Sequence, residues 1–400
     1  MFAHLHCHFS GSYSDSVLSP EKDLDYLVET GHRAVALTDH GELAAVPRFA
    51  RECRRRGLHP VIGCEFYFVE NARESRERND PSRFHLILLA RNREGFQNLV
   101  AINNAAWLEN SFRGVRGLVD WEVLSRHHRG LVALSACFWG SLPQACLRGG
   151  VSAGRRELYR YLDLFGRDFH PELQRHGIPD EEKATRMLLE LSRRCRLDPV
   201  VSNDCHYRLR EDWRVHDALI KTRFGRPTSF SLAARDYFLR DERQMARLGF
   251  PRRFLVNSYE VAASCSVPEE DLLPKAEGFV PEAKGERVYL GRVVRISPVR
   301  ALADAGMVLG RPPSELAALL ELAKKEGGGI WRSLSSRDPE LFHLARGLEG
   351  ATRRSVPVPE RSSRLSSTNL RHLVPLKLSR GKIIFQYPPE DIESAPGYLE

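Results

Sequence analysis

The sequence predicts an α/β protein built on a parallel sheet with crossover helices, either closed into a barrel or left as an open doubly wound sheet. Short apolar runs alternate with helical stretches along residues 1–283, which is typical of repeated strand–helix–strand units. Ionisable residues recur directly after the apolar runs, where α/β barrels build their active sites. A glycine-rich phosphate-binding motif is absent from the sequence, which argues against a nucleotide-binding sheet.

Each expected element has a local cause. Residues 19–31 begin with Ser19 and Pro20 and end at Gly31, a pattern that predicts a helix. The continuous apolar run over residues 33–38 predicts a buried strand. By the same reasoning, further strands are expected over 59–69, 84–90, 131–137 and 198–207, and helices over 42–56, 94–109, 139–148 and 179–196.

Residues 70–83 are charged and lack apolar periodicity, so they are expected to form a loop near the mouth of the sheet. Arg73, Arg76, Arg78 and Arg83 in this loop are candidate phosphate contacts, and a solvated loop is the alternative. Helices are expected over residues 297–310 and 312–329. The second range begins with prolines and a serine and ends with three glycines, which are typical helix start and stop signals. Residues 356–372 are rich in Pro, Ser and Arg and predict a linker or disorder, and residues 373–393 predict a hairpin that turns at Arg380 and Gly381.

Length and composition set the organisation. The 400 residues are 42% hydrophobic and 28% charged, which is ordinary for a globular protein of two or three domains. We expect a barrel over 1–283, a small helical region over 284–355, and a linker with a short hairpin over 356–400. The net charge is +8, and residues 284–400 contribute six of these charges, which favours an anionic partner.

The eight cysteines are scattered without a Cys-x-x-Cys pair, which favours reduced thiols over disulfides. The sequence shows neither a signal peptide pattern nor an apolar run long enough to cross a membrane. We therefore expect a cytoplasmic protein without a membrane partner.

The first fifteen residues are a candidate metal site. His6 and His8 are spaced i, i+2, so in an extended strand both rings point to one face, and Asp15 can return from the following loop. The alternative is a strand at a wet edge with incidental histidines. Asp204 and His206 repeat the i, i+2 spacing after a later strand, which favours a second pair of ligands.

Taken together, the candidate metal ligands are His6, His8, Asp15, His40, Glu65, His85, Cys137, Asp204 and His206. Nine donors are too many for one tetrahedral zinc ion, so we expect two or three ions bridged by Glu65 and an aspartate. Zinc, manganese or iron suit such donors, and clustered metals favour hydrolysis of a phosphoester. From the pattern alone, His85 is better explained as a core histidine because it opens its strand, and Cys137 as a small buried residue.

Seven motifs in order resemble those of the PHP (polymerase and histidinol phosphatase) domain, in the form found at the N-terminus of bacterial DNA polymerase III alpha subunits. They are HLHCHFSGSYSD, ALTDHG, VIGCEFY, FHLILLARNREGFQNLV, LVALSAC, ELQRHG and VSNDCHY. The resemblance implies a distorted (βα)7 barrel with a trinuclear metal centre, and it places all nine candidates at ligand positions, His85 and Cys137 included. It also implies a metal-dependent phosphoesterase, commonly a 3′–5′ exonuclease, acting in DNA replication or repair.

The resemblance implies roles for the acidic residues as well. Asp15, Glu65, Asp204 and Asp39 are the expected catalytic carboxylates, and Asp39 is expected to act by orienting His40 from outside the ligand set. After residue 270 the chain departs from the family, because it lacks the closely spaced aspartates of a polymerase palm. We therefore expect no polymerase activity and only a truncated relative of the fingers region. Arg353 and Arg354 in this region are candidate DNA contacts, and a disordered basic remnant is the alternative.

Three functions remain open from the sequence. The first is a metal-dependent hydrolase acting on DNA, with DNA and DNA polymerase III holoenzyme components as partners. The second is a small-molecule phosphatase of the histidinol phosphatase type. The third is a non-catalytic replication accessory that acts by binding.

Overall fold

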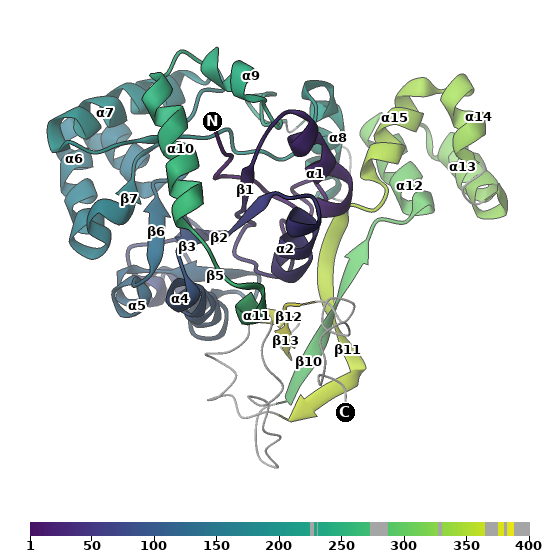
Figure 1. The fold of residues 1–400 in the computed structure, drawn as a ribbon. Coiled ribbons are helices and arrows are strands. Elements are labelled where there is room, and N and C mark those ends of the chain that lie inside the picture. Colours follow the sequence, from purple (N-terminus) through teal and green to yellow (C-terminus); the bar gives the residue numbers. More distant parts are fainter. Residues whose placement is uncertain are drawn as a thin grey trace.

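The fold shown in Figure 1 is that of a computed structural model. It describes residues 1–224, 228–229, 231–272, 287–326, 330–364, 375–379 and 382–387. The predicted α/β class is confirmed: a group of central strands is surrounded by helices, and a second group of helices, α12–α15, lies to one side.

The strands of the first part are β1 (Ala34–Leu37), β2 (His59–Phe68), β3 (Phe84–Ala90), β4 (Ser111–Phe112), β5 (Arg116–Val119), β6 (Leu131–Leu134), β7 (Phe169–His170), β8 (Glu172–Leu173) and β9 (Val200–Val201). Its α-helices are α1 (Pro20–Glu29), α2 (Val46–Arg55), α3 (Ala72–Glu77), α4 (Arg93–Asn104), α5 (Trp121–His127), α6 (Ser141–Phe165), α7 (Pro179–Cys195), α8 (Trp213–Thr222), α9 (Glu242–Ala246), α10 (Arg252–Ser264) and α11 (Glu269–Leu272). A π-helical turn (Ala105–Glu109) extends α4.

The central strands close into a ring. β2 pairs with β1 and β3, β3 pairs with β6, and β6 pairs with β7. One residue after β7 the chain continues as β8, which pairs with β9. The N-terminal segment completes the ring, because Cys7 is bridged to Cys205 just after β9 and His4 is bridged to Val35 of β1. The resulting barrel is built from seven extended segments: the N-terminal segment, β1, β2, β3, β6, the β7–β8 run and the β9 run.

One strand runs against the prediction of a parallel sheet. β3 is antiparallel to both of its neighbours, β2 and β6, whereas the other pairs around the barrel are parallel. The beginning of β3 therefore lies at the rim where the neighbouring strands end. The barrel is distorted in this sense, as the family resemblance implied.

Two expected elements have different bounds. The predicted loop over 70–83 contains helix α3, whose N-cap Asn71 accepts a hydrogen bond from the backbone N–H of Glu74. The helix predicted over 139–148 continues as α6 to Phe165, with a break at Gly149 and Gly150. Gly150 has a φ of +67° there, a conformation that costs glycine least and permits the break.

The second part of the chain comprises helices and a four-stranded sheet. Its helices are α12 (Pro298–Val308), α13 (Pro313–Glu326), α14 (Ile330–Arg337) and α15 (Pro339–Leu348). Its strands are β10 (Arg287–Arg295), β11 (Thr352–Arg364), β12 (Leu376–Ser379) and β13 (Lys382–Phe385), in the order β11-β10-β13-β12. The region predicted to be helical over 284–355 thus also contains β10 and the start of β11.

The predicted linker and hairpin are altered by the same sheet. Residues 356–364, expected to be a linker, lie in β11, which pairs antiparallel with β10. Residues 365–372 lie outside the described residues. β12 and β13 pair antiparallel with Ser379 opposite Lys382, and the expected turn at Arg380 and Gly381 lies outside the described residues.

The C-terminal segment is anchored in the barrel. The Lys377 ammonium lies 2.6 Å from a carboxylate oxygen of Glu42, and both side chains are buried. The Gln386 side-chain oxygen accepts a hydrogen bond of 2.7 Å from the backbone N–H of Leu43. A separate apolar cluster joins Val215 and Leu219 of α8 to α12 and α15. In the described part of the chain, no helix is long and apolar enough to cross a membrane.

Candidate metal centre

The barrel brings the nine predicted donors to one rim. They come from the N-terminal segment (His6, His8), the loop that follows it (Asp15), the end of β1 (His40), the middle of β2 (Glu65), the start of β3 (His85), the end of β6 (Cys137) and the end of the β9 run (Asp204, His206).

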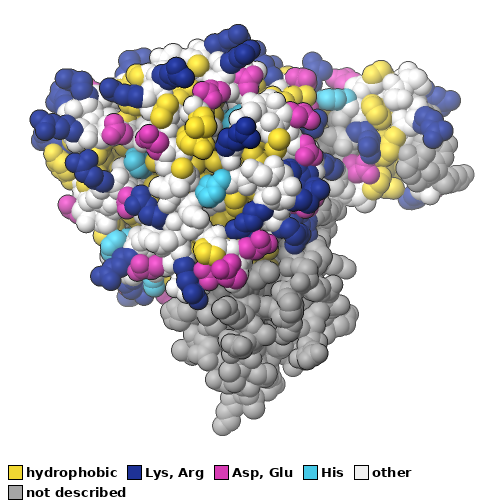
Figure 2. All heavy atoms as spheres, viewed as in Figure 1, with side chains coloured by type: hydrophobic (Ala, Val, Ile, Leu, Met, Phe, Trp, Pro, Cys, Tyr) yellow, Lys and Arg dark blue, Asp and Glu magenta, His cyan; other side chains and the backbone are white. Residues whose placement is uncertain are grey.

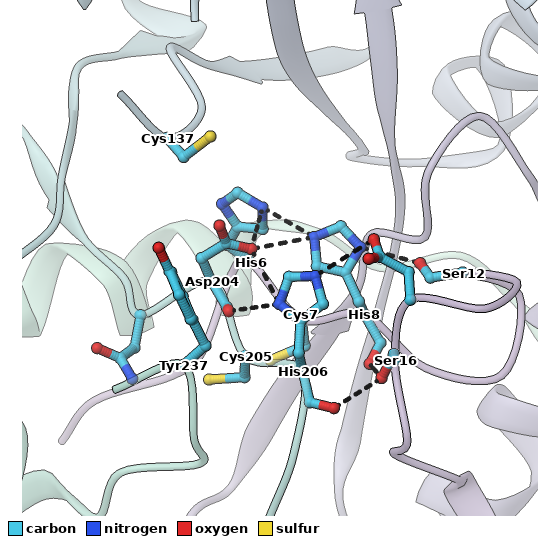
Figure 3. Close-up of polar contacts among 12 residues, drawn as sticks. His6, Cys7, His8, Ser12, Ser16, Cys137, Asp204, Cys205, His206 and Tyr237 are labelled. Carbon is cyan, nitrogen blue, oxygen red and sulfur yellow. Dashed lines mark hydrogen bonds and ion pairs between the residues drawn. The ribbon is translucent and has the colours of Figure 1, made fainter. Parts of the chain in front are cut away.

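His6 and His8 face Asp204 across the bridge between Cys7 and Cys205. The Oδ1 atom of Asp204 lies 3.1 Å from Nε2 of His6 and 3.2 Å from Nε2 of His8. The two Nε2 atoms are themselves 3.1 Å apart. In Figure 3 these three side chains and His206 converge, and Cys137 stands apart from them. The i, i+2 spacing therefore places both imidazoles on one face, as expected.

Glu65 occupies the centre of the cluster. Its Oε2 atom lies 2.8 Å from Nδ1 of His40 and 3.4 Å from Nε2 of His8. Its Oε1 atom lies 3.0 Å from Nδ1 of His85 and 3.4 Å from Nε2 of His6. One carboxylate thus contacts four imidazoles, two through each oxygen.

Asp15 connects His40 to His206. Its Oδ2 atom lies 2.8 Å from Nε2 of His40 and 3.6 Å from Nε2 of His206. The Arg223 guanidinium, from the residue after α8, pairs with the other oxygen at 2.5 Å. The sequence reasoning did not select His216 of α8, which is buried and offers a donor atom within 4.8 Å of those of Asp15 and His206.

Cys137 reaches the cluster through His85, because its Sγ atom lies 3.5 Å from Nδ1 of that histidine. All nine predicted donors therefore belong to one connected group. His85 is placed beside Glu65 and is 18% exposed, so the interpretation of it as a core histidine does not hold.

The donors are suited to a cation because several of their buried nitrogen and oxygen atoms lack a hydrogen-bond partner within the described residues. Both carboxylate oxygens of Glu65, Oδ1 of Asp204 and Nδ1 of His40 are buried and form no well-directed hydrogen bond within the described residues. A buried polar atom without a partner is costly in free energy. Imidazole and carboxylate are also ligands that zinc, manganese and iron accept.

The charges of the group hold its carboxylates ionised. Burial raises the pKa of Glu65, but the nearby His85, His6 and His40 outweigh it and keep that pKa well below its usual range. Asp204 behaves in the same way beside His6 and His206. Burial, together with the charges of His40 and His206, lowers the pKa of His8 to about 3, so His8 is neutral at pH 7 and presents a lone pair.

Hydrogen bonds from outside the ligand set orient the ring of His6. Nδ1 of His6 lies 2.8 Å from Oε1 of Glu172, whose position is fixed by a 2.8 Å hydrogen bond from the Gln174 amide. Carboxylate–histidine pairs of this kind fix the ring of a metal ligand and raise its basicity. Glu172 was not among the predicted site residues, although it is the first residue of the motif ELQRHG, which was the available signal.

Asp39 acts on a different partner from the one expected. Its carboxylate accepts hydrogen bonds from the backbone N–H groups of Phe9 and Gly11, at 2.6 and 2.9 Å, and from the Ser12 hydroxyl at 2.8 Å. Ser12 in turn lies 3.0 Å from Nδ1 of His8. Asp39 therefore positions the loop beside His8 and not the ring of His40. A Cβ atom at Gly11 would collide with this carboxylate, so the close approach requires glycine.

Two of the predicted DNA-contacting arginines, Arg73 and Arg76, contact neighbouring groups of the chain. Arg73 pairs with Glu77 on the exposed face of α3, and Arg76 donates to the backbone oxygen of Glu109. Arg353 and Arg354 lie in β11, and their side chains lie outside the described residues. On the face shown in Figure 2, basic and acidic side chains are interspersed over the described surface.

Two other arginines do lie beside the cluster. They are Arg83 and Arg116, whose guanidinium groups lie over the ring of Tyr67. That ring is stacked on the imidazole of His40. Arg83 is one of the four loop arginines that the sequence offers as phosphate contacts, whereas no sequence pattern marks Arg116.

Comparison with protein families gives the cluster a context. Residues 4–176 match the model of the PHP domain. This chain contains a PHP domain. The matched range holds His6, His8, Asp15, His40, Glu65, His85 and Cys137, and the PHP domain therefore includes seven of the nine donors.

Several DNA polymerase III alpha subunits are relatives of the chain. The subunit of Treponema pallidum is 33% identical over 275 residues, which are 66% of this chain and 23% of the relative. The subunit of Thermus aquaticus is 30% identical over 372 residues, which are 85% of this chain and 30% of the relative. The chain thus spans less than a third of the length of these relatives.

A solved structure from Bifidobacterium adolescentis, provisionally named a metal-dependent phosphoesterase, is 13% identical to this chain. The match covers 51% of this chain and 87% of the other, with a TM-score of 0.33. A similarity this low adds no argument to the PHP assignment.

Proposed function

We propose that this chain is a metal-dependent phosphoester hydrolase that acts on DNA, in the manner of a 3′–5′ exonuclease. The observation that carries the proposal is the position of Glu65, whose two oxygens each face two imidazoles. A carboxylate in this position can serve two cation sites at once, and Asp204 faces His6 and His8 in the same way. Two to three divalent ions, zinc, manganese or iron, suit these donors.

When bound, such ions act as Lewis acids, activate water near neutral pH and stabilise charge on a transferring phosphoryl group. The chain's residues position the donors and control access. His6 and His8 are fully buried, whereas the side chains of Asp15, His40 and His85 are 14 to 18% exposed. A substrate phosphate would therefore approach from the side of Asp15, His40 and His85.

Two observations favour DNA as the substrate. The relatives are named as subunits of a DNA polymerase, and the chain carries a net charge of +8, which suits a polyanion. DNA polymerase III holoenzyme components are then the partners we propose. A phosphorylated metabolite is the competing substrate, and binding without catalysis is the competing role.

We also propose that residues 284–400 do not polymerise DNA. Polymerisation needs closely spaced carboxylates to hold two metal ions. After Asp271 the sequence contains only the isolated aspartates Asp304, Asp338 and Asp391. Primer extension with the purified chain should therefore yield no product.

The deciding experiment combines metal analysis with hydrolysis. The chain is purified without chelator, its metals are quantified, and the same sample is tested on 3′-labelled single-stranded DNA and on p-nitrophenyl phosphate. We expect about two to three ions per chain and chelator-sensitive release of nucleotides, with DNA preferred. Metal-free protein that hydrolyses neither substrate would overturn the proposal, and a preference for p-nitrophenyl phosphate would shift it to a small-molecule phosphatase.

A further inference from the structure

The ring of Tyr67 lies directly against the exposed side of the metal centre. Tyr67 follows Glu65 by two residues in β2, so both side chains belong to the same face of the strand. Its ring stacks on His40 with a centroid separation of 5.7 Å and an interplanar angle of 12°, and it meets His85 edge-on at 5.7 Å. Tyr67 thus extends the wall formed by two of the proposed metal ligands.

Two arginines reach this ring from neighbouring strands. The guanidinium carbon of Arg83 lies 5.1 Å from the ring centroid, and that of Arg116 lies 5.7 Å from it. Each arginine stands two residues before the residue that pairs with Tyr67, which is His85 in β3 and Leu118 in β5. Both cations therefore flank Tyr67, Arg83 from just before β3 and Arg116 from the start of β5.

These guanidinium groups lack the partners that other arginines have. Within the described residues neither Arg83 nor Arg116 forms an ion pair, whereas Arg73 pairs with Glu77 and Arg160 with Glu70. Arg83 donates one hydrogen bond, to the backbone oxygen of Pro81, and its Nε atom is buried without a partner among those residues. Two like charges over one ring repel each other, and an anion between them would relieve that repulsion.

The identity of the anion follows from the chemistry of the groups. Guanidinium binds phosphate with paired, charge-assisted hydrogen bonds. The metal centre is suited to the phosphate that reacts. The arginines are separated from His40 by the ring of Tyr67, so they are suited to a different phosphate of the same molecule.

We propose that Arg83 and Arg116, held over Tyr67, form a second phosphate-binding subsite beside the metal centre. The subsite takes the phosphate that neighbours the scissile one, and it therefore selects a polynucleotide over a phosphate monoester. This inference rests on the proposed function, whose substrate class it specifies.

The test compares the variant R83Q/R116Q with wild type and with R113Q. Arg113 is a matched control because it lies in the same β4–β5 hairpin, is exposed, and donates instead to the side chain of Asn79. Binding of a fluorescein-labelled oligothymidylate is measured in EDTA over a range of salt concentrations. KM and kcat are then measured with manganese for the oligonucleotide and for p-nitrophenyl phosphate, and the metal content of each protein is determined.

We expect the double variant to raise the oligonucleotide KM by about 10-fold with little change in kcat, and to leave p-nitrophenyl phosphate hydrolysis and metal content unchanged. The dependence of log K on log salt should become shallower by about 0.7 for each phosphate that the variant no longer neutralises. R113Q should match wild type in every measurement. Thymidine 3′,5′-bisphosphate, added as an inhibitor, should compete less well in the double variant than in wild type, and equal inhibition of both proteins would contradict the subsite.

The inference is overturned if the double variant binds the oligonucleotide with the salt dependence of wild type, or if both substrates lose turnover equally. Its failure is distinguishable from failure of the proposed function, because the binding measurement in EDTA needs no catalysis. Suppose that the wild-type protein hydrolyses neither substrate, but that R83Q/R116Q binds the oligonucleotide with a shallower salt dependence than wild type. The subsite would then stand, and the proposed hydrolase activity would be rejected.

Discussion

His85 of β3 lies directly opposite Tyr67 of β2, and the two strands run antiparallel. The first residues of β3 are therefore at the same rim as the last residues of β2. This register places the His85 imidazole 3.0 Å from Glu65 and, two residues earlier, the Arg83 guanidinium over Tyr67. A proposed metal ligand and a proposed phosphate-binding cation thus share one strand end.

Removal of a central donor should abolish metal binding without unfolding the barrel. We expect Asp204→Asn and His8→Ala to lower metal content and to reduce hydrolysis by more than about 100-fold, since changes outside the ligand shell alone cost about 10 to 100-fold. Asp204 has a φ of +46°, which asparagine tolerates, so the substitution preserves the backbone. Elemental analysis and circular dichroism check both points, with His128→Ala as control, because His128 is half-buried and is not among the nine donors. Full activity with metal retained in either variant would refute the site.

Glu172 should tune metal affinity from behind His6. We expect Glu172→Gln to weaken metal affinity by about 10 to 100-fold, because the neutral amide no longer polarises the imidazole. Competition with a chromophoric chelator measures the change. Glu190→Gln, which alters an exposed carboxylate on α7 that pairs with Arg194, should have no effect, and an equal loss in both variants would count against a role for Glu172.

How far the sequence predicts this centre depends on strand direction. His6, His8, Asp204 and His206 follow from spacing alone, because i, i+2 residues of an extended strand share a face. His85 does not, since a residue that begins a strand reaches the rim only if that strand is reversed, and strand direction is set by the barrel as a whole. The resemblance to the PHP domain supplied His85 and Cys137, which local pattern could not.

Long-range structure also decides which arginines of the charged loop face the centre. Charge composition marks residues 70–83 as rich in arginine but does not say which side chains turn toward the centre. Helix α3 directs Arg73 to Glu77, whereas Arg83 lies beyond the helix, just before β3. Likewise, β11 was hidden in a Pro- and Ser-rich segment because its pairing with β10 is a long-range contact.

A buried histidine outside the metal centre should give the metal-free protein a pH-dependent stability. Burial, and then the charge of His4, lowers the pKa of His32 to about 3, below its ordinary value near 6.5. The unfolded chain therefore binds more protons between these values, so stability is full above about pH 6.5 and falls as the pH decreases toward 3. We expect His32 to contribute up to about 1.4 kcal/mol per pH unit to this slope. Urea unfolding in EDTA from pH 4.5 to 7 measures the free energy of unfolding at each pH. This free energy should change less steeply with pH in His32→Gln than in wild type, and His128→Gln should show the wild-type dependence.

The ion pair between Glu42 and Lys377 should matter most when it is broken on one side. Burial raises the pKa of Glu42 to about 7 even with Lys377 nearby, so loss of the lysine leaves a buried carboxylate that is charged only at a cost. We expect Lys377→Met to destabilise the chain by about 3 kcal/mol at pH 8, and by less as the pH falls and Glu42 takes up a proton.

A double-mutant cycle checks this pair. The variant Lys377→Met/Glu42→Gln should recover much of the stability lost in Lys377→Met, because it removes the unpaired charge. Denaturant unfolding at pH 8 and pH 5.5 measures both. Additive losses in the double variant would show that the two side chains act independently.

The contact between Glu42 and Lys377 joins positions 335 residues apart. Closing so long a loop is slow, and contacts of this kind form late in folding. During synthesis, residue 42 leaves the ribosome long before residue 377 exists, so a nascent barrel must keep the Glu42 carboxylate hydrated or protonated until the C-terminal segment arrives. Pairing of the buried Glu42 carboxylate is thereby coupled to translation of the segment that carries Lys377.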